Sequence, residues 1–193
     1  MTRRTPGRPD AVDLILEQWR RELPAVDASP MEVFGRLHRS FLRYQSLLSE
    51  LFDRYDLNMA SFDMLATLRR SGPPYRRTAG ELAEISLLTT GGISLRLDRL
   101  EKAGLVVRER DAEDRRVVYA RLTDKGLEVA GSVARAHFAN EARMLDGLTD
   151  AERRQLGRLL SKLERSLEKA ERTPSLPRGQ LPAQGNGSSS IPQ

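Results

Sequence analysis

The sequence predicts a mainly helical protein with one small β-hairpin, in the arrangement called a winged helix-turn-helix. Three observations within residues 78–126 carry this prediction. A capping pattern opens one short helix, a second short helix follows within a few residues, and two runs rich in β-branched residues then flank an acidic turn. Longer helices with apolar stripes are predicted on both sides of this segment.

The two short helices have recognisable ends. Thr78 and Glu81 fit a capping box at the start of the first helix. Thr89 can cap the second helix, and Gly104 is suited to end it. The apolar side chains of the second helix recur at helical spacing: Ile93, Leu97 and Leu100. Two helices this close together predict a helix-turn-helix.

The predicted hairpin has strands at residues 105–110 and 115–122, joined by the acidic tetrad 111–114. Arg115 and Arg116 are therefore expected at its tip. An exposed arginine on a hairpin is often only a solvated charge. Next to a helix-turn-helix, however, it indicates contact with DNA.

Two helices are predicted before this segment. Residues 10–23 form an amphipathic pattern with Leu14, Ile15, Trp19 and Leu23 near one face. Residues 29–32, Ser-Pro-Met-Glu, combine a cap, a first-turn proline and a capping-box carboxylate. The helix that follows is expected to be long, since apolar residues recur every three or four positions: Phe34, Leu37, Phe41, Tyr44, Leu48, Leu51 and Tyr55.

Three further helices complete the prediction. Asn58 caps one with Phe62, Leu65 and Leu68 facing inward, and residues 71–74 end it. Another is expected over residues 123–145, and the last starts at Thr149 and carries a leucine stripe. The predicted division is a disordered N-terminus (1–9), N-terminal helices for dimerisation and a ligand pocket (10–57), a winged helix-turn-helix (58–123), C-terminal dimerisation helices (124–172) and a disordered tail (173–193).

Composition narrows the function. The net charge is +5, and residues 69–121 hold twelve Arg or Lys against eight Asp or Glu, so most of the excess lies on the proposed DNA-binding segment. No apolar run is long enough to cross a bilayer and no signal-peptide pattern occurs, so we expect a cytoplasmic protein that does not bind membranes. The absence of cysteine excludes disulfides and thiol-based redox sensing.

Enzymatic and metal chemistry find no support in the sequence. The two histidines, His38 and His137, show no metal-ligand spacing. No nucleophile elbow, P-loop, dinucleotide fingerprint or HExxH motif occurs. We therefore expect neither an enzyme nor a cofactor.

Four short motifs resemble the MarR family of bacterial transcriptional regulators. They are Asp-Arg-Leu-Glu at 98–101, Gly-Leu-Val at 104–106, Asp-Arg-Arg at 114–116 and Leu-Thr-Asp-Lys-Gly at 122–126. The resemblance covers residues 29–167. It implies a ligand-responsive regulator, by default a repressor, that binds double-stranded DNA as a homodimer. Two recognition helices and two wings would then meet an imperfect palindrome with half-sites about one helical turn apart.

The family pattern also implies which residues meet DNA. Thr90, Gly91 and Gly92 replace a commoner Pro-Ser-Thr, so base contacts are expected from neighbouring side chains and close backbone approach to phosphate from the glycines. In the wing, the Arg of the family's Asp-x-Arg pattern enters the minor groove and the Asp holds the wing or an adjacent Arg. The predicted set is Thr89, Thr90, Gly91, Gly92, Ser94, Leu95, Arg99, Asp114, Arg115 and Arg116.

Four scattered residues resemble the ligand pattern of the urate-responsive subgroup of the family: Trp19, Asp63, Arg96 and Arg108. The extra N-terminal helix supports this resemblance. It implies that a planar anionic purine lies against Trp19, receives hydrogen bonds from Arg108, and disturbs a pair between Asp63 and Arg96. Each residue also has a plain structural interpretation, with Trp19 packing at a helix interface, Asp63 in the first turn of a helix and the two arginines paired with nearby carboxylates.

Other interpretations stay open at this level. The terminal helices could complete a monomeric bundle instead of covering a second subunit. The ligand could be another aromatic or carboxylate anion. The winged helix could bind a protein and not DNA.

Overall fold

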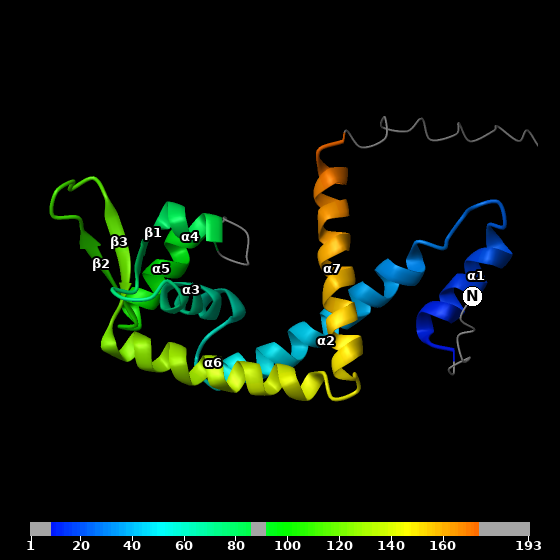
Figure 1. Ribbon diagram of the computed structural model, residues 1–193, viewed down its shortest axis with the longest axis horizontal. Coiled ribbons are helices and arrows are strands. Elements are labelled where there is room, and N and C mark those ends of the chain that lie inside the picture. The colour runs from blue at the N-terminus through cyan, green and yellow to red at the C-terminus, as the bar shows by residue number, and fades with distance from the viewer. Residues whose placement is uncertain (1–8, 86–91, 174–193) are drawn as a thin grey trace, which may run out of the picture. The chain divides into compact units, whose positions relative to one another are not determined.

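The computed structural model describes residues 9–85 and 92–173, and the chain divides into two compact units, Met1–Asn140 and Glu141–Gln193 (Figure 1). The first unit is mainly helical with one small antiparallel sheet, so the predicted fold class is confirmed. The elements are α1 (Ala11–Glu22), α2 (Met31–Asp53), α3 (Met59–Arg70), β1 (Arg76–Thr78), α4 (Ala79–Ile85), α5 (Ile93–Lys102), β2 (Val106–Arg110), β3 (Val118–Leu122), α6 (Asp124–Met144) and α7 (Asp150–Glu171).

Helix α1 starts at a capping box that the sequence pattern did not predict. The Asp10 side chain accepts hydrogen bonds from the backbone of Val12 and Asp13, and the Asp13 side chain accepts one from the backbone of Asp10. The face that packs on α2 carries Val12 and Leu16. The predicted apolar face of α1 is not buried within the chain, because the side chains of Leu14, Trp19 and Leu23 are 45–60% exposed.

Helix α2 is long, as predicted, but its start differs from the prediction. Pro30 occupies the N-cap position and no side chain caps the helix. Ser29 contacts the preceding loop, because its backbone N–H donates to the Asp27 carboxylate at 2.9 Å. Of the expected apolar stripe only Leu48 is buried, together with Phe52, which the predicted stripe did not include. Large apolar side chains along the rest of α2 are exposed: Val33, Phe34, Leu37, Phe41 and Leu42.

The core of the first unit lies around α3. Asn58 caps this helix as predicted, and its side chain accepts a hydrogen bond from the backbone of Ser61 at 2.8 Å. The predicted inward residues Phe62, Leu65 and Leu68 are all buried. Helix α3 packs against α2, α4 and α5 and against β3, so it packs between α2 and the winged region.

The sheet contains one strand that was not predicted. Its order is β1-β3-β2, with both pairings antiparallel. Thr78 pairs with Tyr119, and it also forms the predicted capping box with Glu81, which starts α4. The hydrogen bond from the Thr78 backbone holds the pKa of Glu81 below its usual value. The wing is therefore hydrogen-bonded, through β1, to the start of the helix-turn-helix.

Helix α6 begins in very close contact with the turn that follows α5. An added Cβ at Gly126 would lie 1.9 Å from the carbonyl oxygen of Leu105, a distance that no side chain can occupy. The backbone N–H of Gly126 donates a hydrogen bond to the Thr123 hydroxyl oxygen at 2.9 Å. Glycine is therefore required here for close approach of two backbones.

Helix α7 belongs to the second unit. Thr149 and Glu152 form the predicted capping box at its start. The leucines of its stripe are not buried within the chain: Leu156, Leu159, Leu160 and Leu167 are each exposed by more than a third. Among residues 9–85 and 92–173, no helix is long and apolar enough to cross a membrane.

Candidate DNA interface and ligand site

The second helix of the helix-turn-helix is α5, which has a buried face and an exposed face. Ile93, Leu97 and Leu100 are buried, as predicted. Ser94, Leu95 and Arg99, all predicted to meet DNA, are exposed. Gly92 precedes the helix with a φ of +82°, a conformation that suits glycine, whereas Thr89, Thr90 and Gly91 lie outside the described residues.

The C-terminal end of α5 is held by the start of α6. Gly104 has a φ of +69° and ends the helix, as predicted. The Thr123 hydroxyl donates to the carbonyl oxygen of Gly104 at 2.8 Å, and the Lys125 ammonium donates to that of Ala103 at 3.0 Å. A cation at a helix C-terminus satisfies carbonyl groups and complements the helix dipole. These contacts fix α5 relative to α6.

The wing is a hairpin whose turn is longer than predicted. The turn covers residues 111–117, so the second strand starts at Val118 and not at Arg115. The Asp111 carboxylate accepts from the backbone of Glu113 and Asp114, and that of Asp114 accepts from the backbone of Arg116 at 2.9 Å. Aspartate side chains of this kind favour turns over a continued ladder. Arg115 and Arg116 lie in this turn, at the tip, as predicted.

A second group of contacts supports the base of the wing. The Arg76 guanidinium lies 4.3 Å from the ring centroid of Tyr119, in a cation–π contact. The hydrogen bonds that Asp111 accepts from Asp114 and Glu113 lower its pKa, and the charge of Arg76 adds to this effect. Asp111 is therefore ionised at neutral pH and keeps the turn formed.

Arg108 joins the wing to the recognition helix. From strand β2, its Nη2 lies 2.6 Å from Oδ1 of Asp98 and its Nη1 lies 2.7 Å from Oε2 of Glu101, both in α5. The Arg108 backbone N–H also donates to Glu101, at 3.2 Å. The hydrogen bond to Asp98 raises the pKa of Arg108. The plain interpretation of this residue, pairing with nearby carboxylates, is thus what the structure contains.

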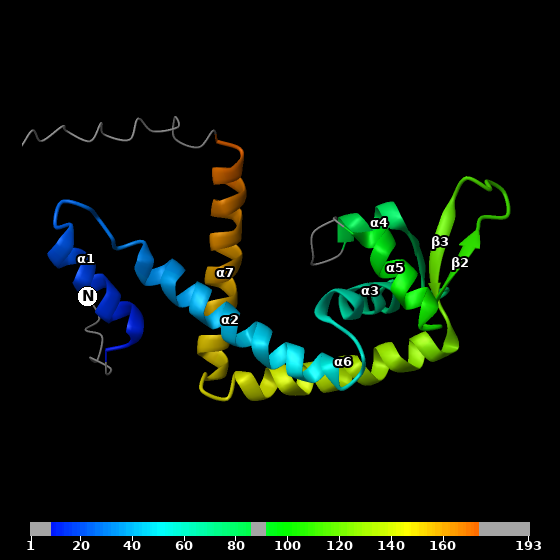
Figure 2. The same ribbon diagram turned by 180° about the vertical axis from the view of Figure 1, so that it is seen from behind.

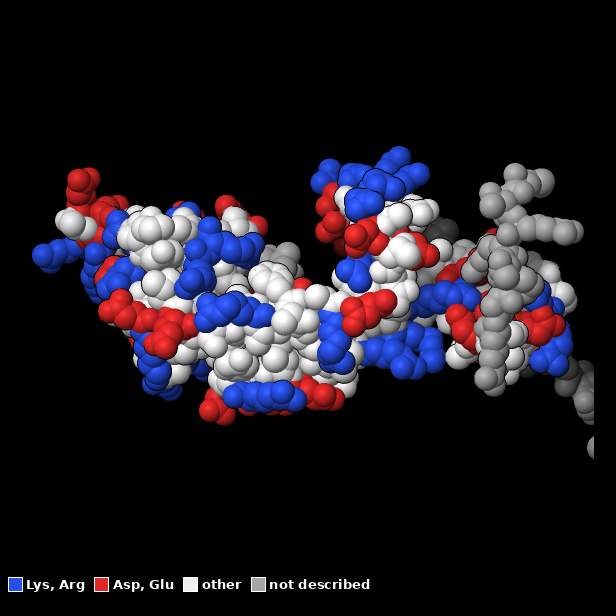
Figure 3. Space-filling view, turned by 60° about the horizontal axis from the view of Figure 1, so that its bottom comes forward, with Lys and Arg blue, Asp and Glu red and all other residues white. Residues whose placement is uncertain are grey.

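Charges of both signs surround these elements. In the space-filling view, blue and red side chains lie next to one another over the end of the molecule that carries the wing (Figure 3). Part of the basic excess of residues 69–121 is paired, as at Arg108 and at Arg121, whose Nε lies 2.6 Å from Oε1 of Glu109. Arg115 and Arg116, in the turn of the wing, are exposed, as a contact with a phosphate or a groove would require.

Of the four predicted ligand residues, Asp63 lines a pocket. This pocket, of about 410 Å³, lies between α3 and α6. Asp63 lies in the second turn of α3 and is buried, so its predicted place in the first turn was wrong. Arg96 is carried by α5, which packs on α3, and Arg108 lies on β2 behind α5.

The same pocket holds residues that the sequence did not single out for ligand binding. His137 is buried, and its ring centroid lies 5.0 Å from that of Phe62 and 5.7 Å from that of Phe52. Arg69 and Arg70 lie at the pocket and donate to the Leu127 carbonyl and the Thr67 hydroxyl, respectively. The only sequence signal that could have grouped Arg69 and Arg70 with Asp63 is their helical spacing on α3, at positions 63, 66, 69 and 70.

Trp19 does not join this group within one chain. It lies on α1, which packs on the N-terminal part of α2, whereas α3 follows the opposite end of α2 (Figures 1 and 2). Among residues 9–85 and 92–173, no cluster of three or more His, Cys, Asp or Glu side chains could hold a metal ion.

Sequence comparison assigns the family. A model of the MarR family matches residues 55–117. The chain is also 37% identical over 153 residues to the HTH-type transcriptional regulator PecS of Dickeya dadantii, and the match covers 79% of this chain and 92% of that protein. The chain belongs to the MarR family. Its relatives are transcriptional regulators and not enzymes.

Solved structures agree on the MarR fold. A MarR variant from E. coli, complexed with operator DNA, superposes with a TM-score of 0.59 at 24% identity, covering 75% of this chain and 96% of that one. BpsR from Bordetella bronchiseptica, whose DNA binding is regulated by 6-hydroxynicotinic acid, superposes with a TM-score of 0.61 at 23% identity. The match covers 68% of this chain and 92% of that one. The predicted family and winged helix-turn-helix fold are therefore confirmed.

Proposed function

We propose that this MarR-family regulator binds a pseudopalindromic operator as a homodimer and is released from it by a small planar anion such as urate. The single observation that supports the DNA-binding mode is the joint between α5 and the wing. Arg108 pairs with Asp98 and Glu101, so the exposed side chains of α5 and the arginines of the wing tip have a fixed spacing. A major-groove helix and a minor-groove arginine can then engage one duplex together.

In this proposal the exposed face of α5 meets base edges and backbone in the major groove. Ser94, Leu95 and Arg99 are its accessible side chains, and Thr89, Thr90, Gly91 and Gly92 complete the contact at its start. Arg116 enters the minor groove, Asp114 holds the turn through the Arg116 backbone, and Arg115 contacts the DNA backbone.

The homodimer is proposed from apolar surface that the chain leaves exposed. Three helices carry such surface, and a soluble monomer seldom exposes several apolar stripes of this length. On α2 the stripe contains Val33, Phe34, Leu37, Phe41 and Leu42, and on α7 it contains Leu156, Leu159, Leu160 and Leu167, whereas α6 adds the single side chain of Phe138. We assign residues 10–57 and 124–172 to dimerisation and 58–123 to DNA binding. Two-fold symmetry then requires half-sites about one helical turn apart, roughly 10 bp.

The ligand response is proposed to act on the contacts of α5. A planar anion at Asp63, near the pocket between α3 and α6, introduces a like charge beside a buried carboxylate. Arg108 has a guanidinium that an oxygen-rich anion can draw away from Asp98 and Glu101. Arg96 lies on the same helix, and its proposed pairing with Asp63 would be disturbed. Each of these changes moves α5 relative to the wing, which weakens DNA binding.

The test measures DNA and ligand in the same protein. Urate is expected to raise the melting temperature of the wild type and to release it from an inverted repeat, taken from the promoter beside its own gene, in a gel shift. A coupling of about 1 to 3 kcal/mol suffices, and DNA must then weaken urate binding equally. Trp19→Phe is expected to bind DNA as the wild type does but to respond poorly to urate. Arg108→Ala is also expected to respond poorly, and it should bind DNA more weakly because it removes the contact between the wing and α5.

Three results would contradict parts of this proposal. If the protein does not bind duplex DNA at low salt, the proposed DNA-binding mode is contradicted, because arginine contacts to phosphate should be strongest at low salt. If analytical ultracentrifugation finds a monomer, the proposed homodimer and its binding to a palindromic operator are contradicted. No effect of millimolar urate removes this ligand, and the next probes are xanthine and 6-hydroxynicotinate, the acid that regulates BpsR.

A further inference from the structure

Helix α7 carries a continuous face of positive charge. At about 100° per residue, five basic side chains of α7 and that of its C-cap fall within an arc of about 80° around the helix axis. All six are exposed, and they span about 27 Å at about 1.5 Å per residue. We call them the basic stripe: Arg154, Arg158, Lys162, Arg165, Lys169 and Arg172.

The basic stripe lies on the opposite side of α7 from its leucines. The centres of the two arcs are separated by about 160° around the helix axis. The leucine side is the one proposed above to cover a second subunit, so the basic stripe faces away from that interface. The leucines are Leu156, Leu159, Leu160, Leu163 and Leu167.

The acidic residues of α7 lie outside the arc of the basic stripe. Glu164, Glu168 and Glu171 follow one flank, and Asp150 and Glu152 precede the stripe in the first turn. Successive members of the stripe are three or four residues apart, so like charges are neighbours at every step. Such neighbours disfavour an isolated helix, whereas a solvated helix face usually alternates the two signs. The segregation therefore indicates a polyanionic partner.

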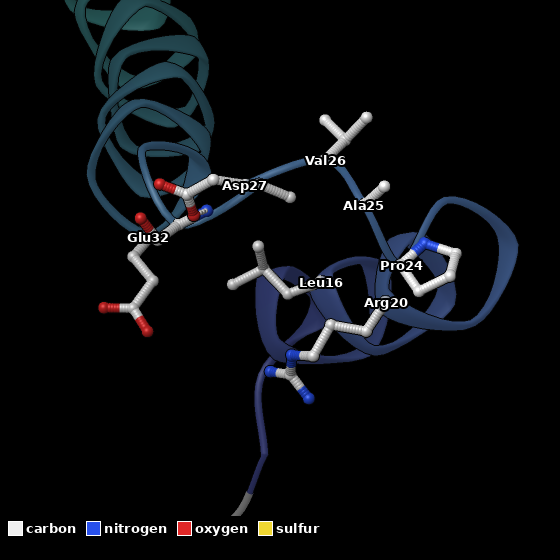
Figure 4. A pocket seen from close by; sticks show the side chains of 9 residues that line it. Leu16, Arg20, Pro24, Ala25, Val26, Asp27 and Glu32 are labelled. Atoms are coloured by element: carbon white, nitrogen blue, oxygen red, sulfur yellow. Dashed lines mark hydrogen bonds between the residues drawn. The ribbon is translucent and has the colours of Figure 1, made fainter.

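Helix α1 shows the more usual arrangement, in which a cation lies among carboxylates of its own chain. Arg20 pairs with Glu17, and the pocket that Arg20 lines also contains the side chains of Asp27 and Glu32 (Figure 4). A surface of this kind needs no external anion. The basic stripe of α7 has no carboxylate within its arc to serve in the same way.

We propose that the basic stripe binds the phosphate backbone of duplex DNA without reading its sequence. This contact is additional to the proposed operator contact of α5 and the wing and does not depend on it. Duplex DNA carries one negative charge per about 1.7 Å of its axis, so a stripe of about 27 Å can lie along roughly 16 phosphates. Four of the six cations are arginines, whose guanidinium fork suits phosphate.

Two further observations favour DNA. The chain belongs to a family of transcriptional regulators, for which duplex DNA is the available polyanion. Residues 150–172 contain no aromatic side chain that could stack on an unpaired base, so a contact with the backbone of a duplex is favoured over binding to a single strand.

Charge-matched variants of the full-length protein test the proposal. The stripe variant replaces three central cations: Arg158→Gln, Lys162→Gln and Arg165→Gln. The control variant removes the same charge from exposed positions on α2 and directly after it: Arg39→Gln, Arg43→Gln and Arg54→Gln. Circular dichroism and ultracentrifugation establish that both variants keep the helix content and oligomeric state of the wild type.

Binding is measured by fluorescence anisotropy with a labelled duplex of random sequence at several salt concentrations. The stripe variant should bind about fivefold or more weakly than the wild type at low salt, and its affinity should depend less on salt because fewer counterions are released. The control variant should stay within about twofold of the wild type. The losses caused by the stripe variant and by Arg116→Ala should multiply when combined, because the two contacts are separate.

Acetylation of lysine gives a readout that needs no variant. The chain contains four lysines, of which Lys162 and Lys169 belong to the basic stripe. The random duplex should protect both from acetylation, measured by mass spectrometry of the wild type. Lys125, whose ammonium donates to the carbonyl oxygen of Ala103, is the internal reference.

Three results would overturn the inference. Equal weakening of the stripe and control variants would mean that only net charge matters. Unchanged acetylation of Lys162 and Lys169 in the presence of the duplex would mean that the stripe does not meet DNA. A stripe variant that keeps its affinity for DNA but loses binding to phosphatidylglycerol vesicles would identify an anionic membrane as the partner. If Arg116→Ala weakens operator binding in each of these cases, the proposed operator contact stands and this inference fails alone.

Discussion

Arg108 of strand β2 and Asp98 of helix α5 are joined by an ion pair of 2.6 Å, so the wing and the recognition helix share one charged contact. Glu101 shares the same guanidinium at 2.7 Å. The Arg108 side chain is only 34% exposed, and two carboxylates are available to it. This pair is the joint on which both proposed activities of the protein depend, DNA binding through spacing and ligand response through its disruption.

Double-mutant analysis of this joint is the first prediction. Arg108→Ala and Asp98→Asn should each destabilise the protein slightly, and a cycle of the two should give a coupling energy of about 0.5 to 1 kcal/mol, typical of a partly exposed pair. The measurement is urea unfolding of the four proteins. Additive effects of the two substitutions would contradict the pairing.

Removing a wing arginine should affect DNA and not folding. Arg116→Ala is expected to weaken operator binding by about 1 to 3 kcal/mol and to make the affinity less dependent on salt, because one positive charge is removed from the interface. Arg54→Ala, directly after α2, is the control, because it removes an arginine from outside the winged region. Titration of labelled operator at several salt concentrations distinguishes the two. Equal affinities for wild type and Arg116→Ala would exclude the wing from the interface.

Gly126→Ala should be strongly destabilising. Its Cβ would meet the Leu105 carbonyl oxygen at 1.9 Å, so the backbone between α5 and α6 must move. A loss of about 1 to 3 kcal/mol is expected for such overpacking. Gly157→Ala is the matched control, since nothing lies within 4 Å of its Cβ position in α7, and alanine there should stabilise the helix by up to about 1 kcal/mol. Thermal unfolding of both variants should show opposite shifts.

The attachment of α1 should be sensitive to acid. Hydrogen bonds from the backbone and from Arg36 lower the pKa of Asp10 and Asp13 from the ordinary 3.8. Groups with lowered pKa values contribute stability that is present above pH 3.8 and is lost as the pH falls through the lowered values. Trp19 fluorescence should therefore report release of α1 only below pH 3.8. In Arg36→Met this release should occur at higher pH, whereas Arg39→Met, on the same helix, should behave as wild type.

Much of the winged region could be predicted from the sequence because its signals are local. Thr78 with Glu81, Asn58, and Gly104 each determine a helix end through contacts within a few residues. The same holds for Thr149 with Glu152. Such caps depend on neighbouring backbone and not on tertiary packing.

The errors occurred where long-range packing decides. Periodicity finds an apolar face on α1 but cannot say which partner covers it, and Val12 and Leu16 face α2 while Trp19 does not. Strand β1 has only three residues, Arg-Arg-Thr, with no apolar alternation, and it exists because β3 offers it a partner. The pocket between α3 and α6 joins residues more than 60 positions apart, which no local pattern encodes.

The pairing of Thr78 with Tyr119 has a consequence for operator choice. Because β1 ties the start of α4 to the central strand β3 of the sheet, the base of the hairpin moves with the helices behind it, and in the proposed DNA-binding mode the arginine tip moves with them. If an operator has a different distance between the bases read in the major groove and the flanking minor groove, the whole winged helix must then rotate to contact both. Sequence variation between the two half-sites should consequently be tolerated better than insertions within either one.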